Sequence, residues 1–89
     1  MAKPYFLIRH QVVDYDQWRQ VYVGHAAERR QAGFREVRLF RNMENPNEVI
    51  ILFEIDDVEK AKAFLESDET REKMKEAQVT DTPDVYFLS

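Results

Sequence analysis

The 89-residue chain contains no cysteine, and its two glycines and three prolines are few for its length. The absence of cysteine excludes disulfide bridges and thiolate-bound zinc or iron–sulfur centres, and it fits a reducing compartment. Two glycines are too few for a glycine-rich loop that binds phosphate. No apolar run approaches the roughly 20 residues of a membrane-spanning helix, and the beginning of the chain lacks the long apolar segment of a signal peptide. We therefore expect a cytoplasmic protein with no membrane segment.

Acidic residues outnumber basic ones, but the excess lies in the second half. Residues 1–43 carry eight Lys/Arg and four Asp/Glu, a balance of +4, whereas residues 44–89 carry five and thirteen, a balance of −8. Because an acidic chain matches a phosphate backbone poorly, we expect no nucleic-acid partner. The arginines of the first half form either a local basic patch or solvated surfaces paired with the acidic half, and the pattern favours pairing. The five arginines concerned are Arg29, Arg30, Arg35, Arg38 and Arg41.

The length suits one domain, residues 1–89, and the hydrophobic pattern predicts elements in the order β-α-β-β-α-β. The apolar runs bounded by turn residues predict strands over 4–13, 34–43, 49–55 and 82–89. The segment ENPNE at 44–48 has the composition of a turn, so the second and third strands form a hairpin.

Two helical segments are predicted between the strands. The first spans 14–33, with Asp14 as N-cap, Gln17 at the third position of a capping box and Gly33 in the left-handed position that ends a helix. The second spans 57–67, starts at a box formed by Asp56 and Glu59, and continues to residue 78 from a cap at Ser67. Its inner face carries Met74 and Ala77, while its charged outer face requires no function.

This order in fewer than 100 residues is typical of an α+β ferredoxin-like fold, a four-stranded antiparallel sheet with two helices on one face. Such a sheet should alternate apolar and polar residues, but several strands carry apolar residues on both faces. The third strand has Ile51 and Phe53 on one side, and Ile50 and Leu52 on the other. Leaving one face in water forfeits many kcal/mol, at about 25 cal/mol per Å². We therefore expect a homodimer that pairs sheet against sheet.

The predicted helix over 14–33 has an unusual inner face. Four large polar or aromatic residues lie within about 60° of one another at 100° per residue; they are Trp18, Tyr22, His25 and Arg29. Two interpretations remain open. The polar tips reach the rim or neighbouring carboxylates around a packed core, or a cavity between helix and sheet makes these side chains line a small-molecule pocket.

His10 is the second histidine, and it shares its strand face with Phe6, Ile8 and Val12. If this face looks toward the helices, His10 approaches His25 in one cavity; if it looks away, His10 lies in the dimer interface. The sequence leaves this choice open. Two histidines without a clear carboxylate partner are too few for a zinc or iron site, so we expect no metal. No cofactor-binding motif is present either, and we expect no cofactor.

Three motifs cover nearly the whole chain in order: D-Y-D-x-W at 14–18, N-P-N-E-V at 45–49 and V-T-D-T-P-D-V-Y-F-L at 79–88. Together they resemble the dimeric α/β-barrel superfamily, in particular antibiotic biosynthesis monooxygenase-like proteins. The resemblance implies that two ferredoxin-like subunits join their sheets into a barrel, with small molecules between each sheet and its helices. Members include cofactor-free quinone-forming monooxygenases, lactone isomerases, polyketide cyclases and haem-degrading enzymes. The last need an Asn, Trp and His constellation whose placement Trp18 and the two histidines do not match.

Given this resemblance, the four residues of the helix face taken together favour a pocket over a packed core. Three functions stay open. The first is an enzyme acting on an aromatic or polyketide-like substrate, with His25 as general base and His10 as second candidate, since neutral imidazole accepts protons near pH 7. Tyr22 and Arg29 would hold a phenolate or enolate oxygen, and Trp18 would stack on the substrate ring. The second is a ligand-binding dimer without turnover. The third is a structural dimer whose pocket is filled by its own side chains.

Overall fold

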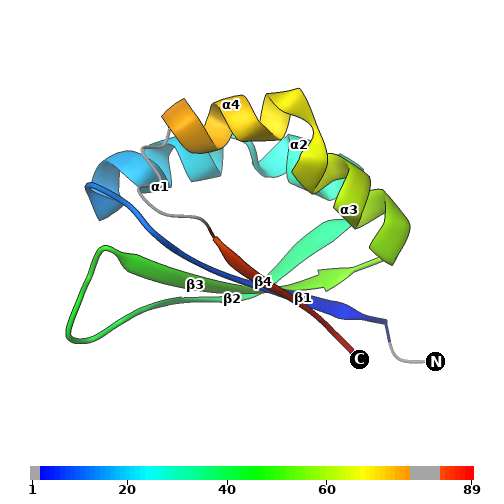
Figure 1. Cartoon of the computed structure of the whole chain (residues 1–89), viewed down its shortest axis with the longest axis horizontal. Coiled ribbons are helices and arrows are strands. Elements are labelled where there is room, and N and C mark those ends of the chain that lie inside the picture. The colour runs from blue at the N-terminus through cyan, green and yellow to red at the C-terminus, as the bar shows by residue number, and fades with distance from the viewer. Residues whose placement is uncertain (1–2, 77–82) are drawn as a thin grey trace.

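The computed structural model describes residues 3–76 and 83–89, and this part of the chain contains four strands and four helices (Figure 1). The predicted ferredoxin-like α+β fold is confirmed, with all helices on one face of the sheet. None of the helices in the described residues is both long and apolar enough to span a membrane. The elements are β1 (Tyr5–Gln11), α1 (Tyr15–Gly24), α2 (Ala26–Gln31), β2 (Phe34–Arg41), β3 (Glu48–Ile55), α3 (Val58–Glu66), α4 (Asp68–Glu76) and β4 (Asp84–Leu88).

The sheet has the strand order β2-β3-β1-β4, and every neighbouring pair is antiparallel. Alternate residues of the two central strands point at the helices and are buried. On this inner face Phe6 is opposite Phe53 in β3 and Phe87 in β4. The buried apolar residues of β1, β3 and the adjoining Val12 are Phe6, Ile8, Val12, Val49, Ile51, Phe53 and Ile55.

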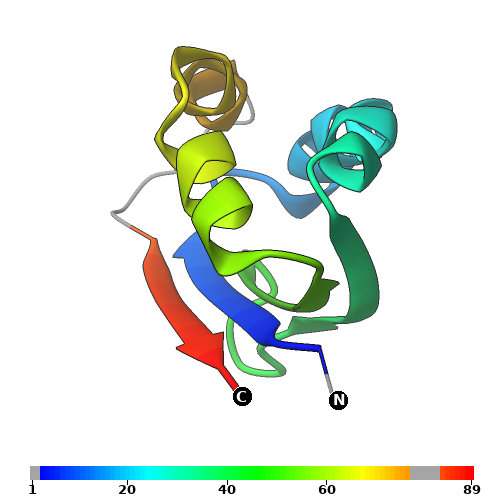
Figure 2. The ribbon, with the colours of Figure 1, turned by 90° about the vertical axis from the view of Figure 1, so that its right-hand side faces the viewer.

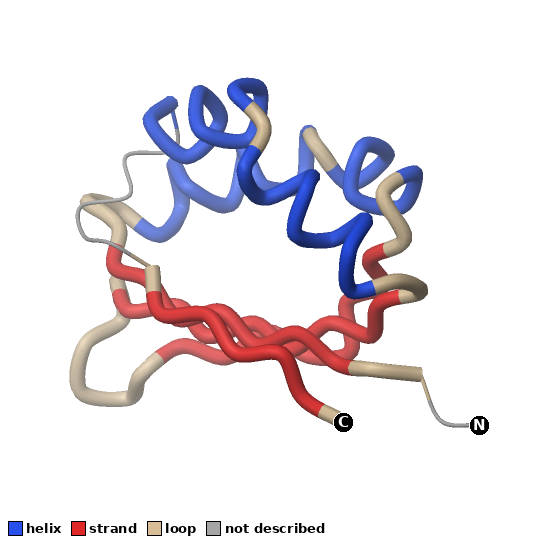
Figure 3. The backbone as a smooth tube through the Cα atoms, turned by 45° about the vertical axis from the view of Figure 1, so that its right-hand side comes forward, coloured by secondary structure: helices blue, strands red, loops and turns tan. Residues whose placement is uncertain are grey.

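The other face of the sheet is also rich in apolar side chains, as the sequence predicts, and no helix covers it (Figure 3). Ile50 and Leu52 are half-buried there, and Tyr86 and Leu88 are 55% and 41% exposed. We call this surface the open face. Three of its charged residues form one cluster, in which Arg9 contacts both Glu48 and Asp84, at 2.6 and 2.9 Å.

The predicted single helix over 14–33 is wrong, because the chain leaves the helical path at one residue. His25 has φ −111° and ψ 20°, and it separates α1 from α2. Gly24 precedes it. Glycine loses the most conformational entropy when it enters a helix, and only proline is less favourable in a helix interior. The carbonyl oxygen of Tyr22 accepts the N–H of His25 at 3.2 Å and the Nη1 of Arg29 at 2.7 Å. The chain then turns into β2 at Gly33, whose φ is 88°.

The helix caps agree with the predictions except at α3. Asp14 is the N-cap of α1 and accepts the N–H groups of Asp16 and Gln17. The N-cap of α3 is Asp57, not Asp56 as predicted, because the Asp56 carboxylate is engaged by Lys3 and Arg35 instead. The hydroxyl of Ser67 accepts the N–H of Thr70, as expected of the cap of α4.

Some predictions lie outside the described residues or at slightly different limits. The inward position of Ala77, the helix end at 78 and the strand start at Thr82 fall in the segment 77–82, which is outside the described residues. The first two strands end two residues earlier than predicted, at Gln11 and Arg41.

The helices form two arms, α1–α2 and α3–α4, that stand on the same side of the sheet (Figure 2).

Candidate functional site

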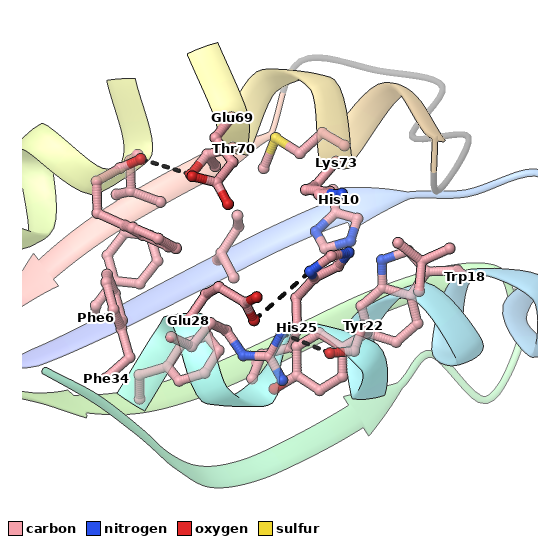
Figure 4. A pocket seen from close by; sticks show the side chains of 18 residues that line it. Phe6, His10, Trp18, Tyr22, His25, Glu28, Phe34, Glu69, Thr70 and Lys73 are labelled. Atoms are coloured by element: carbon pink, nitrogen blue, oxygen red, sulfur yellow. Dashed lines mark hydrogen bonds and ion pairs between the residues drawn. The ribbon is translucent and has the colours of Figure 1, made fainter. Parts of the chain in front are cut away.

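A partly open cavity of about 130 Å³ lies between the sheet and the two helical arms (Figure 4). We call it the inner cavity. The sheet contributes Phe6, Ile8, His10, Phe34, Ile51 and Phe53. The arm α1–α2 contributes Trp18, Val21, Tyr22, His25, Glu28 and Arg29. The arm α3–α4 contributes Phe64, Leu65, Glu69, Thr70, Lys73 and Met74. All four residues of the predicted helix face therefore line one cavity, together with His10.

Phenylalanine rings from the sheet and α3 form the apolar end of the inner cavity. The Phe6 ring contacts that of Phe34 edge-on, with centroids 5.7 Å apart, and lies 6.2 Å from that of Phe53. Phe64 of α3 closes the group at 5.5 Å from Phe34. Edge-on and offset contacts are the favoured geometry of aromatic pairs, so this end offers a preformed surface to another flat ring.

The two histidines reach the inner cavity from different elements. His10 points from β1 toward the helices and is 3% exposed, so the alternative of a place in the dimer interface is wrong. Its ring lies 5.5 Å from that of Trp18. His25 occupies the break between α1 and α2, where the non-helical backbone presents its side chain to the cavity. From the sequence, the two histidines share one cavity if the strand face with Phe6 looks toward the helices. The structure shows that it does.

Glu28 supplies the carboxylate that the sequence analysis did not find. Its Oε2 lies 3.7 Å from the Nδ1 of His25 (Figure 4). This separation is longer than a hydrogen bond, so the carboxylate lies beside the imidazole without fixing which ring nitrogen carries the proton. The i,i+3 spacing of the two residues is the signal that would have revealed the pair. The helix face of Trp18, Tyr22, His25 and Arg29 does not include Glu28, so the pattern of that face gives no sign of the pair.

Tyr22 forms a wall of the inner cavity and is held from several sides. Its ring stacks on Trp18 with centroids 4.8 Å apart, and the Arg29 guanidinium carbon lies 3.6 Å from its centroid. Its hydroxyl donates to Glu36 of β2 at 2.6 Å. Burial, reinforced by this hydrogen bond, raises the pKa of Tyr22 far above its ordinary value. The phenol is therefore a neutral hydrogen-bond donor already engaged by Glu36.

Arg29 is half-buried beside Tyr22. Burial lowers the pKa of its guanidinium, which the neighbouring Tyr22 and carboxylates partly offset. An arginine stays charged at any ordinary pH, so the inner cavity has a permanent cation in its wall. Within residues 3–76 and 83–89, the hydrogen bond of this guanidinium runs from Nη1 to the Tyr22 carbonyl oxygen, and further N–H groups of the fork are available as donors.

The arm α3–α4 gives the inner cavity a polar rim that the sequence did not predict. Glu69, Thr70 and Lys73 line the cavity, although the charged face of α4 was expected to require no function. The hydroxyl of Thr70 donates to the carbonyl oxygen of Phe64 at 2.6 Å and ties the beginning of α4 to the end of α3. In the part of the chain that the structure describes, no three His, Cys, Asp or Glu side chains are arranged to hold a metal ion.

The sequence model of the family described as "Antibiotic biosynthesis monooxygenase" matches residues 14–76. No protein of curated function matches the chain.

Solved structures share the fold along the whole chain. A protein assigned to antibiotic biosynthesis monooxygenases from Bordetella bronchiseptica is 16% identical, with a TM-score of 0.80 over 100% of this chain and 97% of that one. SnoaB, described as a cofactor-independent oxygenase from Streptomyces nogalater, is 18% identical, with a TM-score of 0.71 over 97% and 92%. A conserved protein from Methanosarcina mazei is 15% identical, with a TM-score of 0.73 over 98% and 91%.

Proposed function

Because the chain belongs to the antibiotic biosynthesis monooxygenase family, we propose that it is a homodimeric, cofactor-independent enzyme acting on an aromatic or polyketide-like small molecule. One observation carries the proposal. An apolar cavity under the helices has two histidines and a carboxylate, His10, His25 and Glu28, in its wall. An apolar pocket with a few converging polar groups is the usual form of a small-molecule site.

The size and lining of the inner cavity support an aromatic ligand. Its volume of about 130 Å³ is close to that of an apolar cavity known to bind benzene, about 150 Å³. One ring of a substrate therefore fits among Phe6, Phe34 and Phe64, and a larger substrate extends through the open side.

In the proposed mechanism His25 is the general base. When the Glu28 carboxylate closes the 3.7 Å to Nδ1 and accepts its N–H, Nε2 takes a proton from an acidic C–H or O–H group of the substrate. The resulting carbanion or enolate forms a C–O bond to dioxygen, and the peroxide takes the proton back from His25. Its O–O bond then breaks as the second hydrogen leaves the same carbon, which gives a carbonyl group and one molecule of water. The description of SnoaB as a cofactor-independent oxygenase supports this reaction class. His10 is the second candidate for the proton transfer.

We assign substrate binding to Trp18, Tyr22 and Arg29. Arg29 supplies the positive charge for a phenolate or enolate oxygen, because its guanidinium has donors beyond the one bound to the Tyr22 carbonyl. The stacked rings of Trp18 and Tyr22 form the flat wall against which the substrate packs. Tyr22 joins Arg29 as a donor to the oxygen when its hydroxyl turns away from Glu36.

The homodimer is proposed to form through the open face. The apolar side chains of that face, including Ile50, Leu52 and Tyr86, have no cover within the described chain. Pairing of two such faces removes them from water and gives each sheet a second layer. We place the dimer in the cytoplasm, a reducing compartment that suits a chain without cysteine.

Turnover of a defined probe tests this function. A panel of hydroxylated naphthalenes and anthrones is incubated with the protein, while oxygen consumption and product mass are followed. We expect the wild type to form a quinone and His25→Gln to lose about 100-fold or more in rate. Glu28→Gln should lose about tenfold, and Gln20→Ala, on the exposed side of α1, should match the wild type.

Two results would contradict the proposal. Full turnover by His25→Gln would remove the proposed base. Saturable binding of the probes to the inner cavity without any product would replace the enzyme by a ligand-binding dimer.

A further inference from the structure

A second hollow, of about 350 Å³, lies on the outer side of the arm α1–α2, against the edge strand β2. We call it the outer groove. Tyr22 and Arg29 line both the outer groove and the inner cavity, so they form the wall between the two. The lining of the outer groove is different in character, since it includes four arginines and one carboxylate, that of Glu36.

Three of the four arginines of the outer groove are left without an acidic partner. Arg35 has two, because it contacts Glu54 at 2.7 Å and Asp56 at 3.0 Å. By contrast, no carboxylate of the described residues lies within ion-pair distance of the other three. They are Arg19, Arg29 and Arg30.

These arginines are unpaired although the chain is rich in acids. The chain has 17 acidic and 13 basic residues, and on the open face Arg9 also binds two carboxylates. Arg29 is half-buried, and burial lowers the pKa of its guanidinium, so its charge is held in the wall at a cost that no neighbouring acid fully offsets. The expected pairing with the acidic half therefore applies to Arg35, and within the described residues it fails for Arg29 and Arg30 of the outer groove and also for Arg38 and Arg41.

Glu36, the one acidic residue that lines the outer groove, does not neutralise the arginines there. Glu36 accepts the hydroxyl hydrogen of Tyr22 at 2.6 Å, so one of its oxygen atoms is already engaged. Because Glu54 and Asp56 neutralise Arg35, the excess of positive charge in the lining comes from Arg19, Arg29 and Arg30, against the one carboxylate of Glu36. Guanidinium groups bind planar or tetrahedral oxyanions through parallel N–H donors.

We propose that the outer groove is a second binding site, separate from the inner cavity, that takes a small molecule through its phosphate or carboxylate group. Arg19 of α1 and Arg30 of α2 hold the oxyanion, and Arg29 contributes charge from the wall. This site does not depend on the chemistry of the inner cavity, so it stands or falls separately from the proposed enzyme.

Titration with two simple anions tests the site. Inorganic phosphate and acetate are added to ¹⁵N-labelled full-length protein at constant ionic strength, and the arginine Nε–H and backbone amide resonances are followed by NMR. We expect saturable shifts at Arg19 and Arg30 and none at Arg38, whose guanidinium lies over Phe40 outside the outer groove. A response to phosphate alone or to acetate alone identifies the group that the site prefers.

Matched variants sharpen the result. The double variant Arg19→Gln/Arg30→Gln should bind the effective anion about tenfold or more weakly, because it loses two charge-assisted contacts. Arg38→Gln should bind as the wild type does, and raising the salt concentration should weaken binding throughout. Absence of saturable shifts with both anions, equal shifts at Arg38, or unchanged affinity in the double variant would overturn the proposal.

Discussion

At the scale of single residues, Arg29 closes the break in the first helical arm. Its guanidinium donates to the Tyr22 carbonyl, which a continuous helix would have used, and lies 3.6 Å from the centroid of the Tyr22 ring. We expect Arg29→Ala to lower the free energy of unfolding by about 1–2 kcal/mol, because a hydrogen bond and a cation–π contact are lost together. Urea unfolding measures the change. Arg30→Ala, with an exposed side chain, should stay within about 0.5 kcal/mol of the wild type, and equal losses in both variants would contradict this role.

The raised pKa of Tyr22 should make the folded chain less stable in alkali. Burial and the hydrogen bond to Glu36 raise its pKa above the ordinary 10.0, so above that pH the folded chain keeps a proton that the unfolded chain releases. The free energy of unfolding should therefore fall as the pH rises above about 10, by up to about 1.4 kcal/mol per pH unit. Unfolding by urea between pH 8 and 11 gives the slope. Tyr22→Phe should show a shallower slope, whereas Tyr15→Phe, whose hydroxyl lies 3.4 Å from Arg19 and off the open face, should not; identical slopes in both variants would refute the argument.

At the scale of elements, Asn47 fastens the β2–β3 hairpin to the beginning of α1. Its Oδ1 accepts the N–H of Tyr15 at 3.0 Å, its Nδ2 donates to the Val13 carbonyl at 3.1 Å, and its own carbonyl accepts the N–H of Val12 at 2.9 Å. We expect Asn47→Ala to cost about 1–3 kcal/mol in the free energy of unfolding. Glu44→Ala in the same hairpin is the control and should cost little. A thermal unfolding midpoint that Asn47→Ala leaves unchanged would show that the backbone contact alone suffices.

The elements and their faces were predictable where a repeating pattern governs them. The alternation of β1 and β3 correctly grouped Phe6 with Ile8 and Ile51 with Phe53, but because both faces of the strands carry apolar residues it left open which face meets the helices; the structure buries both groups on the inner face. Gly24 alone did not make the helix break at His25 predictable. A helix tolerates one glycine in its interior at a cost of about 1 kcal/mol in helix stability. The rest of the site, Glu28 and the rim of α4, depends on that break and on how the second arm packs above the sheet. Neither the helix break nor the packing of the second arm produces a periodic pattern in the sequence.

At the scale of the whole molecule, the open face leaves apolar side chains such as Tyr86 and Leu88 uncovered within the described chain. If the homodimer forms there, a charge in the middle of that face should prevent it, because a buried lysine without a counter-ion is costly. We expect the wild type to sediment at twice the 10.7 kDa of one chain, and Leu52→Lys to sediment as a single chain. Met43→Lys, in the hairpin at 97% exposure, should remain dimeric. A monomeric wild type, or a dimeric Leu52→Lys, would place the interface elsewhere.

The wall between the inner cavity and the outer groove also has a thermodynamic consequence. Tyr22 and Arg29 face both spaces, so an occupant of one space that changes their position changes the affinity of the other. Linkage makes this effect reciprocal, and the two ligands must alter each other's dissociation constants by the same factor. If the outer anion draws Arg29 away from the inner oxygen, the two compete without ever touching. If it fixes Arg29 in place, each ligand prepares the binding of the other.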